Sequence, residues 1–194
     1  LARWFLKYDH QYNLPYGYVQ RTSINSVSDT LYPQDFKDEM PGRGDSSLES
    51  KVSLTKNTDD FHWSVETAYY KSLLAKDPLE SNNDSVHRFP EIYVNMAPTH
   101  ILGTNFLFQL NTNYVNFTRD NLSYDDLDSN RDPVTPNGQY DPSTDFIRTG
   151  QRLDVEPEVS YPVNFGTALS ILPSVSFRQI RYQFPIGEDP STYR

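Results

Sequence analysis

The chain contains no cysteine among its 194 residues, and it contains no long charge-free apolar run. Without cysteine, neither a disulfide framework nor a cysteine-ligated metal site can form within these residues. The apolar runs fall well short of the ~18 residues that a membrane-spanning helix requires. No stretch has the pattern of a secretory signal peptide. Basic residues are outnumbered by 26 Asp and Glu to 17 Lys and Arg, and the net charge of −9 argues against a nucleic-acid partner.

Aromatic residues are abundant for so polar a chain. They make up 14% of it, with 14 Tyr, while all hydrophobic residues together make up only 36%. This combination is typical of a β-barrel wall, in which one face of each strand is apolar and the other is wet. A secreted β-sandwich would have a similar composition, so composition leaves both open.

The segment from Arg152 to Tyr161 shows a two-residue alternation most clearly. Leu153, Val155 and Val159 occupy odd positions, and charged residues fill most of the even positions between them. Successive side chains of a strand point to opposite faces, so this segment has one apolar face and one charged face. About ten residues is also the length of a strand that crosses a membrane at a tilt.

Seven further segments have a similar pattern or are rich in β-branched and aromatic residues. The eight expected strands are Arg3–Tyr12, Tyr16–Val27, Leu48–Lys56, Phe61–Lys71, Val86–Met96, Thr104–Thr118, Arg152–Tyr161 and Thr167–Gln183. Short connections alternate with three long ones, residues 28–47, 72–85 and 119–149. An outer-membrane barrel alternates in this way, with short periplasmic turns and long external loops. We therefore predict an all-β fold, an antiparallel transmembrane β-barrel to which residues 1–194 contribute about eight strands.

Eight strands can close a small barrel or form an arc of a larger one. The chain starts at Leu1 and ends in what reads as a loop. We expect it to be an arc, part of one outer-membrane barrel domain whose remaining strands are absent from this sequence.

The alternation assigns polar side chains to the lumen of this barrel and apolar side chains to lipid. The lumen-facing candidates are Gln109, Asn111, Asn113, Arg152, Asp154, Glu156 and Glu158. The lipid-facing candidates are Trp63, Val65, Phe106, Phe108, Leu110, Leu153, Val155 and Val159. We interpret the carboxylates of residues 154–158 as lining of a solvated wall, because a catalytic pair would need a cleft and a raised pKa.

The sequence predicts no enzyme, no cofactor, and no catalytic or metal-binding residue. The four His residues lack metal-ligand spacing, and nothing marks a nucleophile. Residues 126–137 begin like an EF-hand, but Arg131 occupies the position of its Gly and Asn137 that of its Glu. Pro90, Pro157 and Pro173 fall inside expected strands, where proline typically marks a bulge or an edge.

Several motifs, taken in order, resemble one protein family. Ser28-Asp29, Tyr32 and Asp35-Phe36 are similar to an "SD…Y…DF" element, and the segment His87–Tyr93 is similar to one with an Arg, a Pro and an acidic residue before an apolar strand. Residues 149–162 and Tyr182 resemble the strands that follow. Together, over about residues 8–183, the chain resembles the outer-membrane LPS-assembly protein family, LptD or OstA, in its C-terminal barrel.

The resemblance implies a function that alternation alone does not. Such a protein inserts lipopolysaccharide (LPS) into the outer leaflet of the outer membrane of a Gram-negative bacterium. Its partners would be LPS, an LptE-type plug lipoprotein, membrane lipid, and periplasmic LPS-bridge proteins that meet an N-terminal jelly-roll domain. No segment here resembles that jelly-roll, and we expect it to be absent from this sequence. The family's lateral gate joins the first and last barrel strands, and an interior arc supplies no residue to it.

The acidic loop suggests one further hypothesis. Residues 120–145 contain seven Asp. A solvated acidic loop is the simpler interpretation, and a place among the divalent cations that bridge LPS head groups is the functional one, with Asp125, Asp126 and Asp128 as its candidates. Two alternatives to LPS assembly stay open: a general porin or substrate-specific channel, and a secreted β-sandwich binding module.

Overall fold

The computed structural model describes residues 2–36, 45–74, 77, 79, 82–135 and 137–186, and the fold over these residues is almost entirely antiparallel β-sheet. Only a 3-10 turn, η1 (Pro15–Gly17), and a one-turn helix, α1 (Tyr32–Asp35), interrupt it. The long strands are β1 (Phe5–Asn13), β2 (Tyr18–Val27), β3 (Ser47–Asn57), β4 (Phe61–Ser72), β5 (His87–His100), β6 (Leu107–Thr118) and β9 (Gly150–Ser160). The short ones are β7 (Tyr124–Asp125), β8 (Phe146–Ile147), β10 (Val163–Phe165), β11 (Leu169–Ile171), β12 (Ser174–Ser176) and β13 (Gln179–Gln183).

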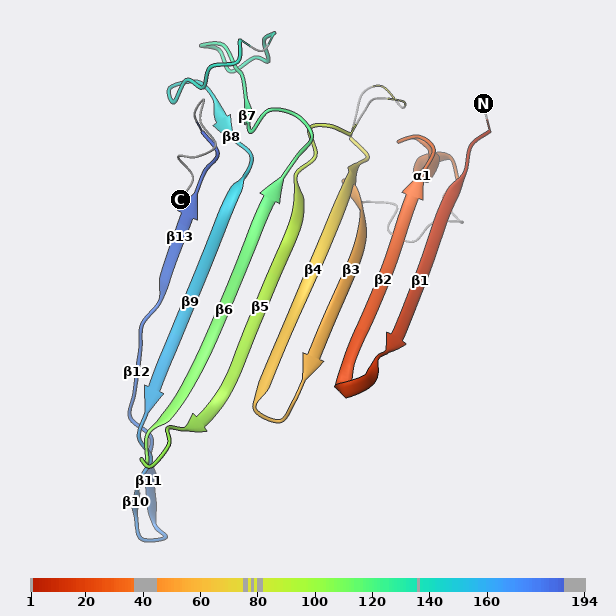
Figure 1. The fold of residues 1–194 in the computed structure, drawn as a ribbon. Coiled ribbons are helices and arrows are strands. Elements are labelled where there is room, and N and C mark those ends of the chain that lie inside the picture. The colour runs from red at the N-terminus through yellow and green to blue at the C-terminus, as the bar shows by residue number, and fades with distance from the viewer. Residues whose placement is uncertain are drawn as a thin grey trace.

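One sheet contains all the long strands. Its order is β1-β2-β3-β4-β5-β6-β9, and both β12 and β13 pair with the far side of β9 (Figure 1). Each long strand lies beside its neighbour in sequence because short turns join most of them, which favours antiparallel hairpins. The prediction of an all-β antiparallel fold is confirmed, and the sheet as described has two open edges rather than closing into a barrel.

The alternation of connections has a direct structural counterpart. The turns after β1, β3, β5 and β9 lie at one end of the sheet, and the connections that contain α1 and the β7–β8 pair lie at the other (Figure 1). We call these the turn end and the loop end. Residues 37–44 of the first long connection, and 75–76, 78 and 80–81 of the second, lie outside the described residues.

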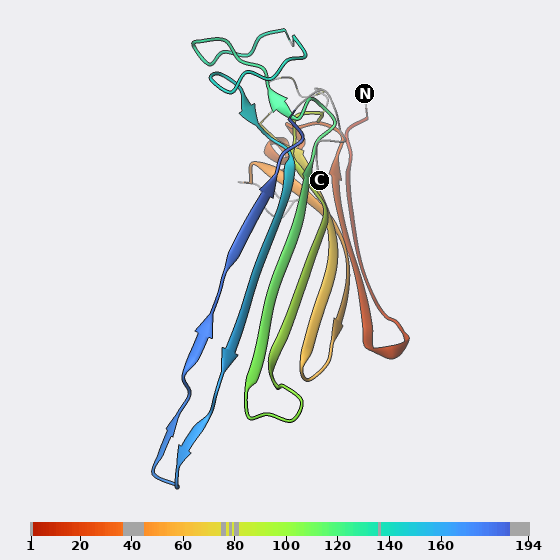
Figure 2. The same ribbon diagram turned by 60° about the vertical axis from the view of Figure 1, so that its left-hand side comes forward.

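The prediction of the eighth strand is wrong in detail. This strand was predicted as one strand over Thr167–Gln183, but it divides into β11, β12 and β13, and the predicted turn 162–166 contains β10. A single register nevertheless unites these pieces, since Phe165 pairs with Leu169, Val159 with Val175 and Val155 with Gln179. The hairpin tip extends beyond the other turns (Figure 2).

Two of the three strand prolines explain where the pairing is irregular. The β5 ladders shift register between Arg88 and Glu91, around Pro90, as expected for a bulge. The interval between β12 and β13 lies opposite Pro157, whose carbonyl accepts the Phe177 N–H. Pro157 has no N–H to return, so the ladder cannot complete that pair.

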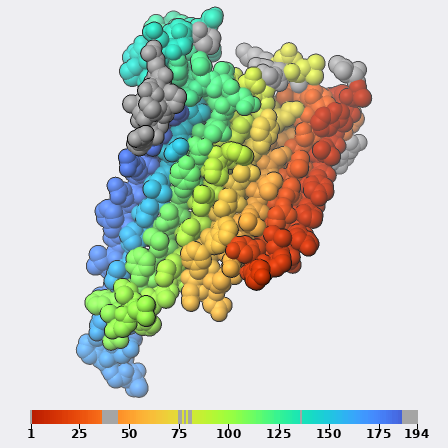
Figure 3. All heavy atoms as spheres, viewed as in Figure 1, coloured from red at the N-terminus to blue at the C-terminus, as the bar shows by residue number. Residues whose placement is uncertain are grey.

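The sheet is a single layer with little enclosed core. Its fully enclosed hydrophobic residues are few, and the side chains of the strands themselves form the face seen in Figure 3. Among the described residues, no helix is long and apolar enough to cross a membrane. Because a single sheet cannot bury both faces by itself, its stability depends on what covers each face.

Candidate functional site

Register and alternation divide the predicted site residues between the two faces of the sheet. On one face Gln109 pairs with Glu158, Asn111 with Glu156 and Asn113 with Asp154; we call it the polar face. On the other, the apolar face, Phe108 pairs with Val159, Thr112 with Val155 and Tyr114 with Leu153. Trp63 and Val65 join the apolar face through their partners Val94 and Ile92 of β5. The Phe106 ring packs at a tilt against that of Tyr161, with ring centres 4.9 Å apart. The lumen-facing and lipid-facing sets therefore lie on opposite faces; what each face meets stays a prediction.

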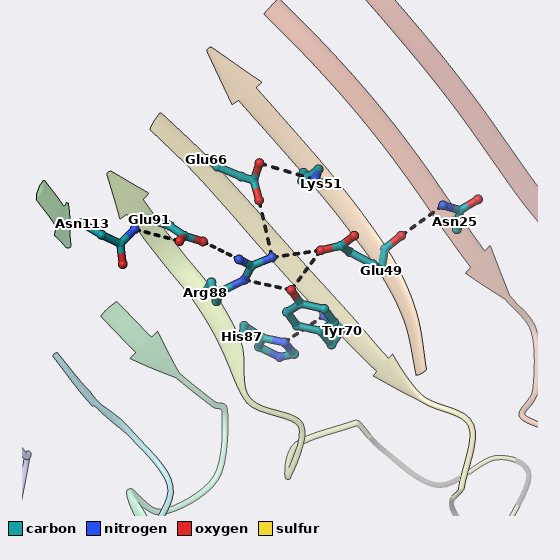
Figure 4. Close-up of polar contacts among 9 residues, drawn as sticks. All are labelled: Asn25, Glu49, Lys51, Glu66, Tyr70, His87, Arg88, Glu91 and Asn113. Atoms are coloured by element: carbon teal, nitrogen blue, oxygen red, sulfur yellow. Dashed lines mark hydrogen bonds and ion pairs between the residues drawn. The ribbon is translucent and has the colours of Figure 1, made fainter. Parts of the chain in front are cut away.

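A polar network centred on Arg88 joins β3, β4 and β5 on the polar face (Figure 4). The Arg88 guanidinium lies 3.1 Å from a Glu49 oxygen and 3.5 Å from a Glu66 oxygen, and it also pairs with Glu91. Its Nε donates to the Tyr70 hydroxyl at 2.8 Å, and that hydroxyl donates to Glu49 at 2.9 Å. One cation thus holds three carboxylates, each from a different strand. We call these five residues the Arg88 network.

The network continues across β6 to β9. Asn113 donates to Glu91 at 3.0 Å and accepts from Arg152 at 2.7 Å. Beyond it, Arg178 pairs with Asp154 on the same face at 2.7 Å. Four carboxylates and three guanidinium groups therefore lie along this band. Such a band is hydrated or binds a polar partner more readily than it supports acid–base chemistry, because its carboxylates are engaged by cations.

The motif that begins at His87 compensates for a backbone hydrogen bond that is lost at the bulge around Pro90. The His87 Nδ1 accepts the Tyr70 backbone N–H at 3.1 Å, and the imidazole stacks on Tyr69 with ring centres 4.2 Å apart. The side chain thus supplies a bond that the shifted ladder omits. His87 and Arg88 together pin β4 to β5 where backbone pairing is irregular, so this motif has a structural role.

The Ser28–Phe36 motif forms a second clamp, at the loop end. Arg3 binds both oxygens of Asp29 at 2.8 and 2.9 Å and pairs with Asp35 at 2.6 Å. These hydrogen bonds hold the pKa of the Asp29 carboxyl below its usual range. The guanidinium also lies 5.7 Å from the Tyr32 ring centre and 5.3 Å from that of Phe36. The clamp therefore fastens α1 to the start of β1.

The carboxylates of the acidic loop form ion pairs and hydrogen bonds within the loop itself. Asp125 pairs with Arg119 and Arg148, Asp126 accepts the Asn137 N–H, and Asp128 accepts the N–H groups of Asn130 and Asp132. Asp residues that accept neighbouring backbone N–H groups stabilise turns. Within the part of the chain that the structure describes, no three His, Cys, Asp or Glu side chains are grouped closely enough to hold a metal ion. The geometry thus favours a structural role over the cation hypothesis.

Sequence reasoning missed the members of the Arg88 network as a group. Glu49 and Glu66 occupy polar positions of alternating strands, so their face was predictable. Their convergence on Arg88 was not, because it depends on the bulge at Pro90, which changes the β4–β5 register. Arg3 was missed because it contacts Asp29 across 26 residues of sequence.

The fold and this site define a class of protein. A one-layer antiparallel sheet with one apolar and one polar face, and with structured loops at one end, is the construction of an amphipathic β-sheet protein. A family model described as "LPS transport system D" (LptD) matches residues 2–192. The chain therefore belongs to the LptD family.

Curated relatives agree with this assignment. The LPS-assembly protein LptD of Xanthomonas euvesicatoria pv. vesicatoria is 28% identical over 187 residues, which cover 91% of this chain and 22% of the relative. That of Cupriavidus necator is 24% identical over 190 residues, covering 98% of this chain and 20% of the relative. The chain thus spans about a fifth of the length of these relatives.

Proposed function

We propose that this chain is part of the wall of a transmembrane β-barrel that assembles LPS in the outer membrane of a Gram-negative bacterium. The observation that carries the proposal is the family match over residues 2–192, together with relatives named LPS-assembly proteins. The role is structural and transporting rather than enzymatic. Residues 1–194 would be part of one barrel domain, with the other strands and a periplasmic jelly-roll supplied by the rest of the protein.

The two faces of the sheet support a membrane location. On the apolar face, Val65, Leu110 and Leu153 form part of a surface with no second layer to cover it among the described residues. Both edges of the sheet are also open, and lipid leaves unpaired backbone groups at such edges unsatisfied. Lipid against the apolar face, and further strands at both edges, would resolve both problems.

Aromatic residues at the turn end support a boundary of the bilayer there. Tyr12, Tyr18, Trp63, Phe106 and Tyr161 each lie within about two residues of a strand terminus at this end. Tyr18 meets Trp63 edge to face at 5.8 Å, and the Lys56 ammonium lies 4.7 Å from the Tyr18 ring centre. Aromatic girdles with snorkelling lysines are typical of a membrane–water interface. We place the turn end in the periplasm and the loop end outside, because outer-membrane barrels have short periplasmic turns and longer external loops.

The polar face would line the lumen and meet the polar partners. Beside the Arg88 network lies an open hollow of about 620 Å³. The residues that line it include Asp9, Arg21, Lys51 and Glu66. Balanced charges and many hydrogen-bonding groups suit an LptE-type plug or the sugars of LPS. The periplasmic bridge proteins would act through the missing N-terminal domain.

A porin or substrate-specific channel is the second candidate, because the same two-faced wall serves a channel. The test is depletion of the full-length protein in its own bacterium, followed by measurement of surface LPS and of LPS held in the inner membrane. We expect surface LPS to fall and inner-membrane LPS to rise. Normal surface LPS combined with lost uptake of a small solute would favour the channel and overturn the proposal.

A further inference from the structure

The ladder between β2 and β3 stops half-way up the wall. Paired residues run from Tyr18–Lys56 to Ser23–Lys51, although β2 continues to Val27 and β3 begins at Ser47. The neighbouring β1–β2 and β3–β4 ladders continue through these same segments. We call the interval between residues 24–27 and residues 47–50 the β2–β3 seam; it lies at the loop end.

Side chains replace the missing backbone bonds across the seam. The Asn25 N–H donates to the Ser50 hydroxyl at 3.0 Å, and that hydroxyl donates to the Asn25 carbonyl at 2.9 Å. The Asn25 amide donates to the Glu49 carbonyl at 3.0 Å, a contact visible in Figure 4. The Lys71 ammonium donates to the Val27 carbonyl at 2.6 Å. Four hydrogen bonds thus satisfy backbone groups at this part of the wall, and each depends on a side chain.

A small apolar cluster closes the seam. Val27 of β2, Tyr32 of α1 and Leu48 of β3 are buried together, with Phe5 and Leu73 packed against them. The cluster joins the elements on both sides of the seam, and the Arg3 clamp fastens α1 beside it. Separation of β2 from β3 would therefore require this cluster to come apart.

We propose that β2 and β3 separate and rejoin at the β2–β3 seam, so that the loop-end half of the wall widens and closes there. This inference goes beyond the proposed function and rests on it only in placing the wall in a membrane. In lipid, separation of two ladder-paired strands exposes bare backbone groups, which is prohibitive. At the seam, the flexible side chains of Asn25, Ser50 and Lys71 can follow one strand or exchange partners. The wall can then change its cross-section at this line while its other ladders stay intact.

The test is a pair of distance distributions, measured between nitroxide labels in the full-length protein in lipid nanodiscs. The seam pair is Ser26→Cys with Ser46→Cys, and the control pair across the continuous ladder is Gln20→Cys with Leu54→Cys. We expect a narrow distribution for the control pair and a broader one for the seam pair. Ser50→Ala should move the seam distribution outward by about one strand spacing, ~5 Å, and leave the control unchanged. Ser53→Ala, in the same strand but within the paired ladder, should change neither.

Equal, narrow distributions for both pairs, unchanged by Ser50→Ala, would overturn the inference. If Ser50→Ala fails to fold, Lys71→Met removes a different bond of the seam and is read in the same way. The measurement reports a distance and not LPS transport. A seam that widens in a protein without LPS activity would keep this inference and reject the proposed function.

Discussion

Arg88 is the residue on which the polar face depends most. Its guanidinium meets Glu49, Glu66, Glu91 and the Tyr70 hydroxyl, so it satisfies partners in three strands at once. Removal of one member of a hydrogen-bonded charge network leaves the others desolvated and unpaired, which costs more than the loss of an exposed pair.

Arg88→Met should therefore destabilise the wall by about 1–3 kcal/mol, because the three carboxylates then repel one another. The measurement is the urea concentration at half-unfolding in detergent. Arg178→Met is the matched control, since the Arg178 guanidinium pairs with the single carboxylate of Asp154 among the described residues and is largely exposed. This variant should lose less stability. Equal losses for the two variants would contradict this role of Arg88.

Gly150 is a position where only hydrogen fits. A Cβ there would lie 2.8 Å from the Phe184 ring and 2.9 Å from the Gln183 carbonyl, and the φ of +155° is itself rare for other residues. Gly150→Ala should cost about 1–3 kcal/mol by overpacking. Gly166→Ala provides the control, because its φ is +59° but no atom lies within 4 Å. Partial recovery of stability in Gly150→Ala with Phe184→Ala would confirm the clash with the ring; no recovery would assign the loss to the Gln183 carbonyl or to backbone strain.

At the scale of elements, the loop from Arg119 to Thr149 is held by Asp side chains. Both Asp145 oxygens accept backbone N–H groups, from Leu127 at 3.0 Å and Asp141 at 2.8 Å. These bonds favour the carboxylate and lower the pKa of Asp145 below its ordinary value of 3.8. A lowered pKa contributes stability that is fully present above the ordinary value and is lost as the pH falls through the folded-state value.

The loop should accordingly keep its shape at neutral pH and become protease-sensitive only in acid, as the pH falls below about 4. Cleavage by an acid-active protease over this range is the measurement. Asp145→Ala should be cleaved readily throughout the range, whereas Asp120→Ala, at an exposed position, should behave as the unmodified protein. Unchanged protection in Asp145→Ala would show that other contacts hold the loop.

The elements differ in how far the sequence predicts them. The first seven strand segments could be located because alternation and β-branched content are local signals, and the division of polar and apolar faces followed directly. The break of the last strand at Pro173 and opposite Pro157 was less accessible, because an interrupted ladder depends on the partner strand. The Arg88 network, the Arg3 clamp and the β2–β3 seam could not be predicted from the sequence, since each depends on contacts between residues distant in sequence.

At the scale of the whole molecule, the central claim is that one face of this sheet meets lipid and the other meets water. Val155 and Glu156 test it most directly, because they are adjacent in the middle of β9 and point to opposite faces. The measurement uses nitroxide labels at Val155→Cys and Glu156→Cys in the full-length protein in bilayers. We predict that residue 155 is relaxed by oxygen and shielded from a water-soluble nickel complex, and that residue 156 shows the reverse. Equal access of the nickel complex to both positions would contradict the account.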